Sequence, residues 1–199
     1  MDTQTQATVS PLNLRLTVYS ALFTTLIIIG GYVSVPIGPV PIALADFFVM
    51  LAGLFLGWRW GLVSVLLWLF LGALGLPVFA GGKAGLAVFM GPTAGFFLGY
   101  IFLVLSVGFL AGQGKPSWLR NTVALIIGSA LLYPPGVLWL KTLLNMNWTA
   151  ALTAGFFPFI PGTVIKIVAA VALGQTLLPR FRQSFNLTSI QPVKDEGAK

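Results

Sequence analysis

Long apolar segments, separated by short connections, occupy most of this chain of 199 residues. A helix that crosses the hydrocarbon core of a bilayer needs about 20 mainly apolar residues. By that measure the pattern predicts six membrane-spanning helices, at about residues 14–34, 43–57, 59–76, 92–112, 119–144 and 161–181. The membrane domain then covers residues 14–183, between polar tails at 1–13 and 184–199. We therefore expect an all-α, polytopic membrane protein with no separate soluble domain.

The connections between these spans are of two kinds. Those after the second and fourth spans are short and basic, whereas the other three are rich in glycine, proline and aromatic residues. Cytoplasmic loops of membrane proteins carry an excess of lysine and arginine. Because six crossings place both termini on one side, this positive-inside rule predicts that both tails are cytoplasmic. The expected cytoplasmic face collects Arg15, Arg59, Lys115, Arg120, Arg180, Arg182, Lys194 and Lys199.

The amino-acid composition limits the classes of function that the chain can have. Hydrophobic residues make up 57% of the chain and charged residues only 8%, against about 25% charged residues in soluble domains. The chain has no Cys and no His, so it lacks thiolate nucleophiles and the commonest metal ligand and general base. Three of its four acidic residues lie in the polar tails, and no GxxxxGK[ST] phosphate-binding motif is present. We therefore expect no enzyme, no metal and no cofactor, and no ATP-driven transport by this chain alone.

The positive-inside rule does not explain four charged residues. Asp46, Lys83, Lys141 and Lys166 all fall toward the predicted outer side, although a charge within the membrane costs at least ~2.5–3.5 kcal/mol on insertion scales. One interpretation is an outward-facing pocket in which lysines bind the carboxylate of a small anionic ligand. Free backbone donors at a helix start near Pro161 would assist. The alternatives are that Lys141 only reaches toward the outer headgroups and that Asp46 only pairs with a lysine.

Two apolar connections suggest how such a pocket is covered. VPIGPVPIA (35–43) and PVFAGGKAG (77–85) contain almost no polar side chains. Non-helical backbone at membrane depth is tolerated where it is buried in protein, so we expect both connections to form lids. Gly81, Gly82 and Gly85 permit positive φ and a close approach of the backbone to a ligand. A tight re-entrant turn would explain these glycines as well.

Small residues at four-residue spacing mark the first span. Ser20 and Thr24 form one row, and Ala21 and Thr25 form the next. Such faces allow helices to approach closely. The contact could lie inside the bundle or with a partner protein.

Five segments together carry a family resemblance. They are PIGPVPIAL (36–44), LAGLFLG (51–57), LLWLFLGALGLPVFAGG (66–82), GPTAGFFLG (91–99) and PGTVIKIVAA (161–170). In combination they resemble the BioY family, the biotin-binding S components of energy-coupling-factor (ECF) transporters. The resemblance covers roughly residues 15–183.

The resemblance implies a six-helix S-component fold in the plasma membrane of a prokaryotic cell, with a biotin site toward the outside. It implies partners as well: a transmembrane T component, which would dock on Ala21 and Thr25, and two ABC-type ATPases. Some BioY proteins are reported to work without such a dedicated module. Lys166 would bind the valerate carboxylate of biotin, and Lys83 with the glycine loop would close over the site. The residues expected at the ligand are Lys166, Lys83, Gly82, Asp46, Thr163, Phe79, Phe89, Phe96, Tyr133 and Trp139.

The chain departs from the family pattern at several polar positions. Thr163 stands where PGDxxK has an acid, and Lys83 stands where an Asn is often found. Ala45, beside Asp46, replaces a common Gln, and GPTGGY reads GPTAGF (91–96). Lys83 and Asp46 could compensate for these losses. Two alternatives remain: an S component for another small carboxylated vitamin, and a structural or accessory membrane protein whose polar residues only pair with one another.

Overall fold

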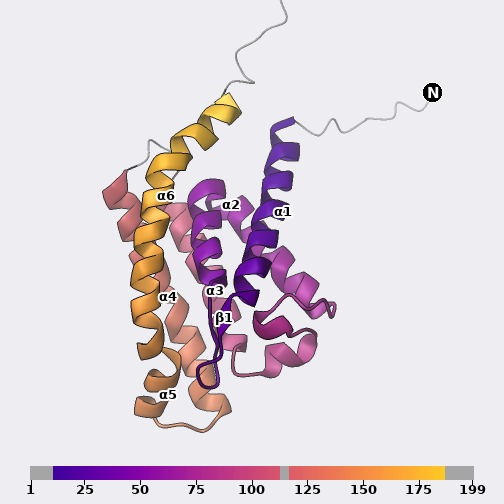
Figure 1. Ribbon diagram of the computed structural model, residues 1–199, viewed down its shortest axis with the longest axis vertical. Coiled ribbons are helices and arrows are strands. Elements are labelled where there is room, and N and C mark those ends of the chain that lie inside the picture. The colour runs from indigo at the N-terminus through magenta and orange to yellow at the C-terminus, as the bar shows by residue number, and fades with distance from the viewer. Residues whose placement is uncertain (1–10, 113–116, 187–199) are drawn as a thin grey trace, which may run out of the picture.

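The computed structural model describes residues 11–112 and 117–186, and it is almost entirely helical (Figure 1). Most of each predicted tail lies outside these residues, except helical residues 11–13 and 184–186. Three predicted cytoplasmic lysines also lie outside them: Lys115, Lys194 and Lys199. The long helices are α1 (Pro11–Tyr32), α2 (Ala45–Ala73), α3 (Ala94–Ala111), α4 (Trp118–Leu143) and α6 (Ile160–Asn186). The shorter elements are β1 (Ser34–Val35), β2 (Ile42–Ala43), α5 (Trp148–Gly155) and the 3-10 turns Ala80–Gly82, Leu86–Met90 and Phe157–Phe159.

Five helices in the described part of the chain are long and apolar enough to cross a membrane. The predicted second and third spans both fall within α2, which is interrupted at Gly57. There φ is 75° and ψ is −175°, a conformation outside the helical region that glycine adopts without strain. α2 therefore consists of two helical halves, 45–56 and 58–73.

The two halves of α2 lie against each other. A Cβ atom built on Gly61 would lie 3.1 Å from the carbonyl oxygen of Ala52, although nine residues of straight helix would separate these positions by about 13 Å. Val104 of α3 lies close to both Gly53 and Gly61, one in each half. The chain thus reverses direction at Gly57, which agrees with two predicted spans there. The total of six membrane crossings remains a prediction.

α1 packs against the second half of α2 through small hydroxyl residues. The Ser20 hydroxyl donates to the carbonyl of Trp60 at 3.1 Å, and the Thr24 hydroxyl donates to that of Ser64 at 3.0 Å. Both side chains are buried, whereas Ala21 and Thr25 are exposed. The two predicted rows of small residues therefore differ, because only the first is used inside the bundle.

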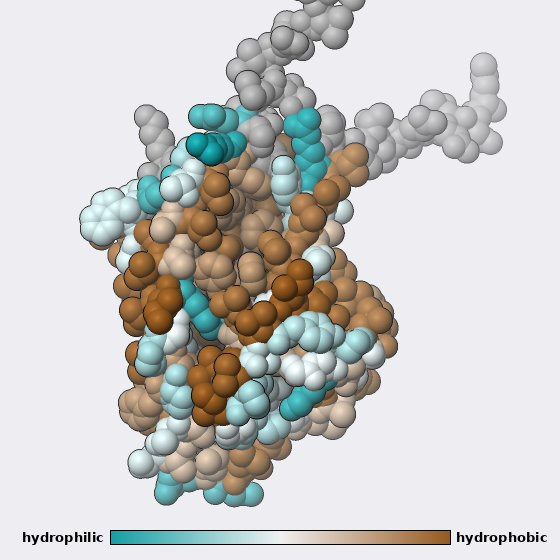
Figure 2. Space-filling view, in the orientation of Figure 1, coloured by the Kyte–Doolittle hydropathy of each residue, from teal (hydrophilic) through white to brown (hydrophobic). Residues whose placement is uncertain are grey.

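The start of α1 and the end of α6 lie at the same end of the molecule (Figure 1). Phe181 of α6 contacts Tyr19 of α1 and Phe55 near the turn of α2, with ring centroids 4.8 and 5.4 Å apart. Hydrophilic side chains gather at this end, and hydrophobic ones cover much of the face between the two ends (Figure 2). Two described ends on one side of the bundle agree with an even number of crossings.

The opposite end is formed by the β1–β2 hairpin, α5 and the connections near them (Figure 1). The sequence predicted only a loop between residues 144 and 161, but α5 and a 3-10 turn occupy most of it. Asn147 caps α5 by accepting a hydrogen bond from the Ala150 amide at 2.8 Å. With eight residues, α5 is too short to cross a membrane by itself. The sequence therefore located this connection but not the short helix within it.

Candidate functional site

A cavity lies at the end of the bundle that carries the β1–β2 hairpin. Its volume is about 50 Å³. Residues from the hairpin, α2, the connection after α2, α3, α4 and the turn before α6 all contribute to it. The lining includes Val40, Pro41, Ala43, Asp46, Trp68, Phe79, Lys83, Thr93, Phe96, Phe97, Tyr100, Tyr133 and Phe159.

Aromatic rings form a continuous wall of the cavity. Phe79 stacks on Phe97 with ring centroids 4.8 Å apart, and Trp68 meets both rings edge-on at 5.5 and 5.7 Å. Trp68 and Phe79 are each only 2% exposed. The Trp68 indole donates a hydrogen bond to the carbonyl of Val78 at 2.9 Å, which fixes the connection after α2 against the bundle. This wall suits an apolar, ring-containing ligand body.

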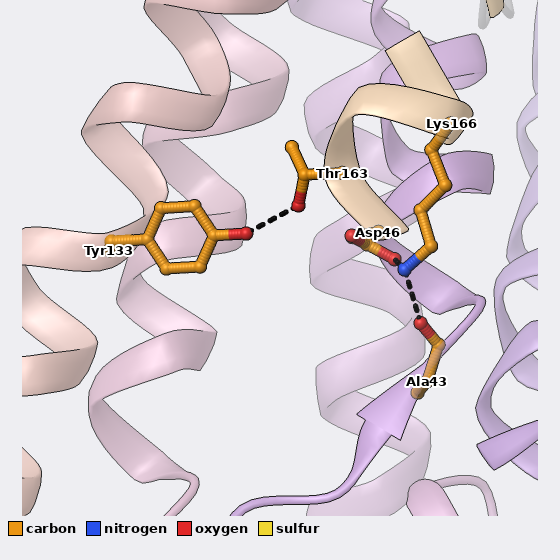
Figure 3. A network of polar contacts seen from close by, with 5 residues as sticks. All are labelled: Ala43, Asp46, Tyr133, Thr163 and Lys166. Atoms are coloured by element: carbon orange, nitrogen blue, oxygen red, sulfur yellow. Dashed lines mark hydrogen bonds and ion pairs between the residues drawn. The ribbon is translucent and has the colours of Figure 1, made fainter. Parts of the chain in front are cut away.

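Lys166 of α6 binds two residues of the cavity lining, Asp46 and Ala43, but is not itself part of that lining (Figure 3). The Lys166 ammonium lies 2.7 Å from a carboxylate oxygen of Asp46 at the start of α2, and it donates to the carbonyl of Ala43 in β2, also at 2.7 Å. The two charged side chains are 11% and 10% exposed. The sequence alternative that Asp46 pairs with a lysine is confirmed, and the partner is Lys166. An ammonium group has three donors, and these contacts use two of them.

A second polar contact lies beside the first (Figure 3). The Tyr133 hydroxyl of α4 and the Thr163 hydroxyl of α6 are 2.5 Å apart, and both side chains are buried. Tyr133 lines both the cavity and a groove between α4 and α6, whereas Thr163 lines only the groove. Thr163 therefore acts on the cavity by holding Tyr133 in place.

The two predicted lids both reach the cavity. Val40, Pro41 and Ala43 come from the 35–43 connection, and Phe79 and Lys83 come from the 77–85 connection. Gly81, Gly82 and Gly85 have positive φ, as expected. Lys83 itself is exposed, so its ammonium stays in contact with solvent at the cavity. Gly82 shapes the turn but does not line the cavity.

Three residues proposed from the sequence are placed differently. Phe89 does not line the cavity but packs at a tilt on the ring of Phe97, with the two ring centroids 5.1 Å apart. Trp139 is 39% exposed and donates from its indole to the carbonyl of Gly91, so it supports the start of α3 from outside the cavity. The Lys141 ammonium lies over the Trp148 ring, 5.1 Å from its centroid, and takes no part in the lining.

Sequence reasoning missed four aromatic residues of the lining: Trp68, Phe97, Tyr100 and Phe159. A signal existed for Tyr100, because it lies four residues after Phe96 and therefore on the same face of the predicted helix at 92–112. No comparable signal marks Trp68, which lies in the middle of an apolar span. Within the described residues, no group of three or more His, Cys, Asp or Glu could hold a metal ion.

Comparison with known proteins places this chain in a family. A family model described as the BioY family matches residues 3–183. The chain belongs to the BioY family. It is 36% identical over 164 residues to "Biotin transporter BioY" of Thermotoga maritima, covering 82% of this chain and 96% of that protein. It is 41% identical over 173 residues to a protein of the same name from Rhizobium etli, covering 81% and 91%.

The fold agrees with that of a solved structure. The crystal structure of the S-component for biotin from an ECF-type ABC transporter has a TM-score of 0.77 and 32% identity to this chain. The match covers 89% of this chain and 95% of that one. The predicted S-component fold is therefore confirmed, as is membership of a transporter family rather than an enzyme family.

Proposed function

We propose that this BioY chain binds biotin in the cavity described above and serves as the S component of an ECF-type transporter in the plasma membrane. The observation that carries the proposal is a cavity lined by aromatic rings, Lys83 and Asp46, with the Lys166 ammonium bound to Asp46 beside this lining. Biotin has the matching shape, an apolar bicyclic ring system with a chain that ends in a carboxylate. The names of the relatives support the same ligand.

Lys166 is the residue we assign to the ligand carboxylate. Its ammonium keeps a third donor beyond the contacts to Asp46 and Ala43. A hydrogen bond between charged groups is worth about 1.5–3 kcal/mol, so Lys166→Ala should weaken biotin binding by about 10- to 150-fold. Phe79, Phe96 and Tyr133 would contact the apolar part of biotin, and Lys83 would lie at the mouth.

Calorimetric titration of the purified protein with biotin and with biotin amide tests this assignment. The amide lacks the negative charge, so it should bind the unaltered protein more weakly than biotin. In Lys166→Ala the two ligands should bind almost equally. If biotin keeps its advantage over the amide in this variant, Lys166 does not bind the carboxylate.

A competition panel with desthiobiotin, lipoate and thiamine examines the ligand itself. Displacement of biotin by desthiobiotin alone would support biotin specificity. A stronger response to lipoate would point to another carboxylated ligand. If no compound of the panel binds or raises the melting temperature, the polar residues serve only the internal structure.

The proposed partners are a T component and two ABC-type ATPases. Ala21 and Thr25 form an exposed small-residue face on α1, next to the row that packs inside the bundle. Such a face admits a second helix at short distance. Thr25→Trp should therefore reduce copurification of the T component while biotin binding to the isolated chain is retained. Loss of both activities would indicate misfolding, and loss of neither would exclude this face as the docking site.

A further inference from the structure

A second hollow runs along the outside of the bundle between α4 and α6. Its volume is about 740 Å³. Its floor is buried and includes Tyr133, Val137 and Thr163, while its rims are exposed. The rim residues are Ile126, Ala130 and Leu138 on α4 and Ile160 and Val164 on α6.

The groove is almost free of available polar groups. Its three hydroxyl side chains are already engaged: Ser129 donates to the carbonyl of Leu125 at 2.7 Å, and Tyr133 and Thr163 bond to each other. The surface that remains is aliphatic and aromatic. A hydrocarbon chain can therefore fill this groove without leaving a buried polar group unpaired.

The dimensions of the groove match one leaflet of a bilayer. Ile126 and Leu138 are twelve residues apart on α4, which corresponds to about 18 Å along a helix. Half of the hydrocarbon core is about 15 Å thick. An acyl chain that lies parallel to α4 would thus extend along the whole groove.

A cation marks one end of the groove. Lys141 lies on the same face of α4 as Val137, one turn farther along, and its ammonium rests over the ring of Trp148, which also lines the groove. Asp46 is the one acidic residue in the described part of the chain, and it pairs with Lys166. Lys141 therefore has no carboxylate partner among the described residues. Tryptophan and lysine together are typical of the headgroup level of a membrane.

We propose that the α4–α6 groove binds an anionic phospholipid, with one acyl chain between the helices and the phosphate on Lys141. The phosphate supplies the negative charge that Lys141 lacks, through a charge-assisted hydrogen bond. The acyl chain packs on Tyr133, which lines both the groove and the cavity, and on Thr163, which bonds to it. The lipid thereby covers the outer side of the cavity wall.

Native mass spectrometry of the detergent-purified chain with added phosphatidylglycerol and phosphatidylcholine tests the proposal. The unaltered protein should retain phosphatidylglycerol preferentially, and Lys141→Ala should reduce that preference about fivefold, the effect of roughly 1 kcal/mol per basic residue near an anionic surface. Arg59→Ala is the matched control, because Arg59 rests over Trp58 in the same way, 4.9 Å from the ring, but away from the groove. It should leave the preference unchanged.

Two groove-filling variants test the acyl-chain position. Ala130→Phe and Val164→Trp enlarge exposed rim residues on opposite sides, and either one should abolish retention of the lipid. Equal retention of the two lipids, or retention that both folded variants preserve, would mean only a non-specific lipid shell and would overturn the proposal. A dimer that Ala130→Phe dissociates would also overturn it, because the groove would then be an interface between two copies.

Discussion

Replacing Asp46 with asparagine tests whether the ion pair with Lys166 stabilises the folded bundle. The change keeps the size of the side chain and removes its charge, so the Lys166 ammonium keeps the carbonyl of Ala43 but loses its counter-charge. Removing one partner of a buried pair costs about 3–5 kcal/mol. We expect about 3 kcal/mol, because each side chain is about one-tenth exposed and the asparagine oxygen can still accept a hydrogen bond.

The expected loss corresponds to a clear shift in melting temperature. For a chain of this size, 1 kcal/mol shifts the midpoint by about 2–4 °C, so Asp46→Asn should melt about 6–12 °C lower than the unaltered protein without ligand. Lys166→Met leaves the carboxylate unpaired and should have a similar effect. The double variant removes both charges and should recover to within about 1 kcal/mol of the unaltered protein.

Thermal unfolding followed by tryptophan fluorescence in one detergent compares these variants. Lys83→Met serves as the control, because Lys83 is exposed and pairs with no carboxylate among the described residues. It should change the free energy of unfolding by less than about 1 kcal/mol. If the double variant loses the sum of the two single losses, the charges are not coupled and the reasoning is refuted.

Four further predictions concern packing and the second lysine. Gly108→Ala should destabilise the protein by about 3 kcal/mol or more in thermal unfolding, because its Cβ would lie 2.3 Å from the backbone of α2 at its turn. Gly162→Ala meets nothing within 4 Å and should be neutral or slightly stabilising. Thr24→Val removes a buried hydrogen bond between α1 and α2 and should cost about 1 kcal/mol, whereas the same change at exposed Thr25 should cost almost nothing. Lys83→Asn should weaken biotin binding in calorimetry by no more than about fivefold, since an exposed ion pair is worth at most about 1 kcal/mol.

The helices could be located from the sequence because lipid demands long apolar runs. The predicted spans at 92–112 and 119–144 agree with α3 and α4 to within two residues at each end. α6 instead continues to Asn186, five residues beyond its predicted end. Its last turns carry polar residues and leave the apolar pattern. Hydropathy locates the part of a helix that lies in lipid and does not register a polar extension of the same helix.

The charged residues of the site could be found from the sequence because a charge in an apolar span is costly. Their partners could not be identified in the same way. Asp46 and Lys166 are 120 positions apart, and Ala43 contributes only a backbone carbonyl, which no residue pattern reveals. The aromatic residues carry still less information, because the chain has 16 phenylalanines. Only the packing of α2 on α3 distinguishes Phe97, which lines the cavity, from Phe89, which does not.

The charge of the site agrees with a ligand that carries one carboxylate. Lys83 and Lys166 contribute two positive charges and Asp46 contributes one negative charge, so the three residues carry a net charge of +1. A monocarboxylate brings this sum to zero, whereas a dicarboxylate would leave an uncompensated negative charge beside Asp46, at a cost that low dielectric increases. We therefore expect Asp46 to do more than hold Lys166 in position: by cancelling the charge of one of the two lysines, it should favour ligands with a single negative charge.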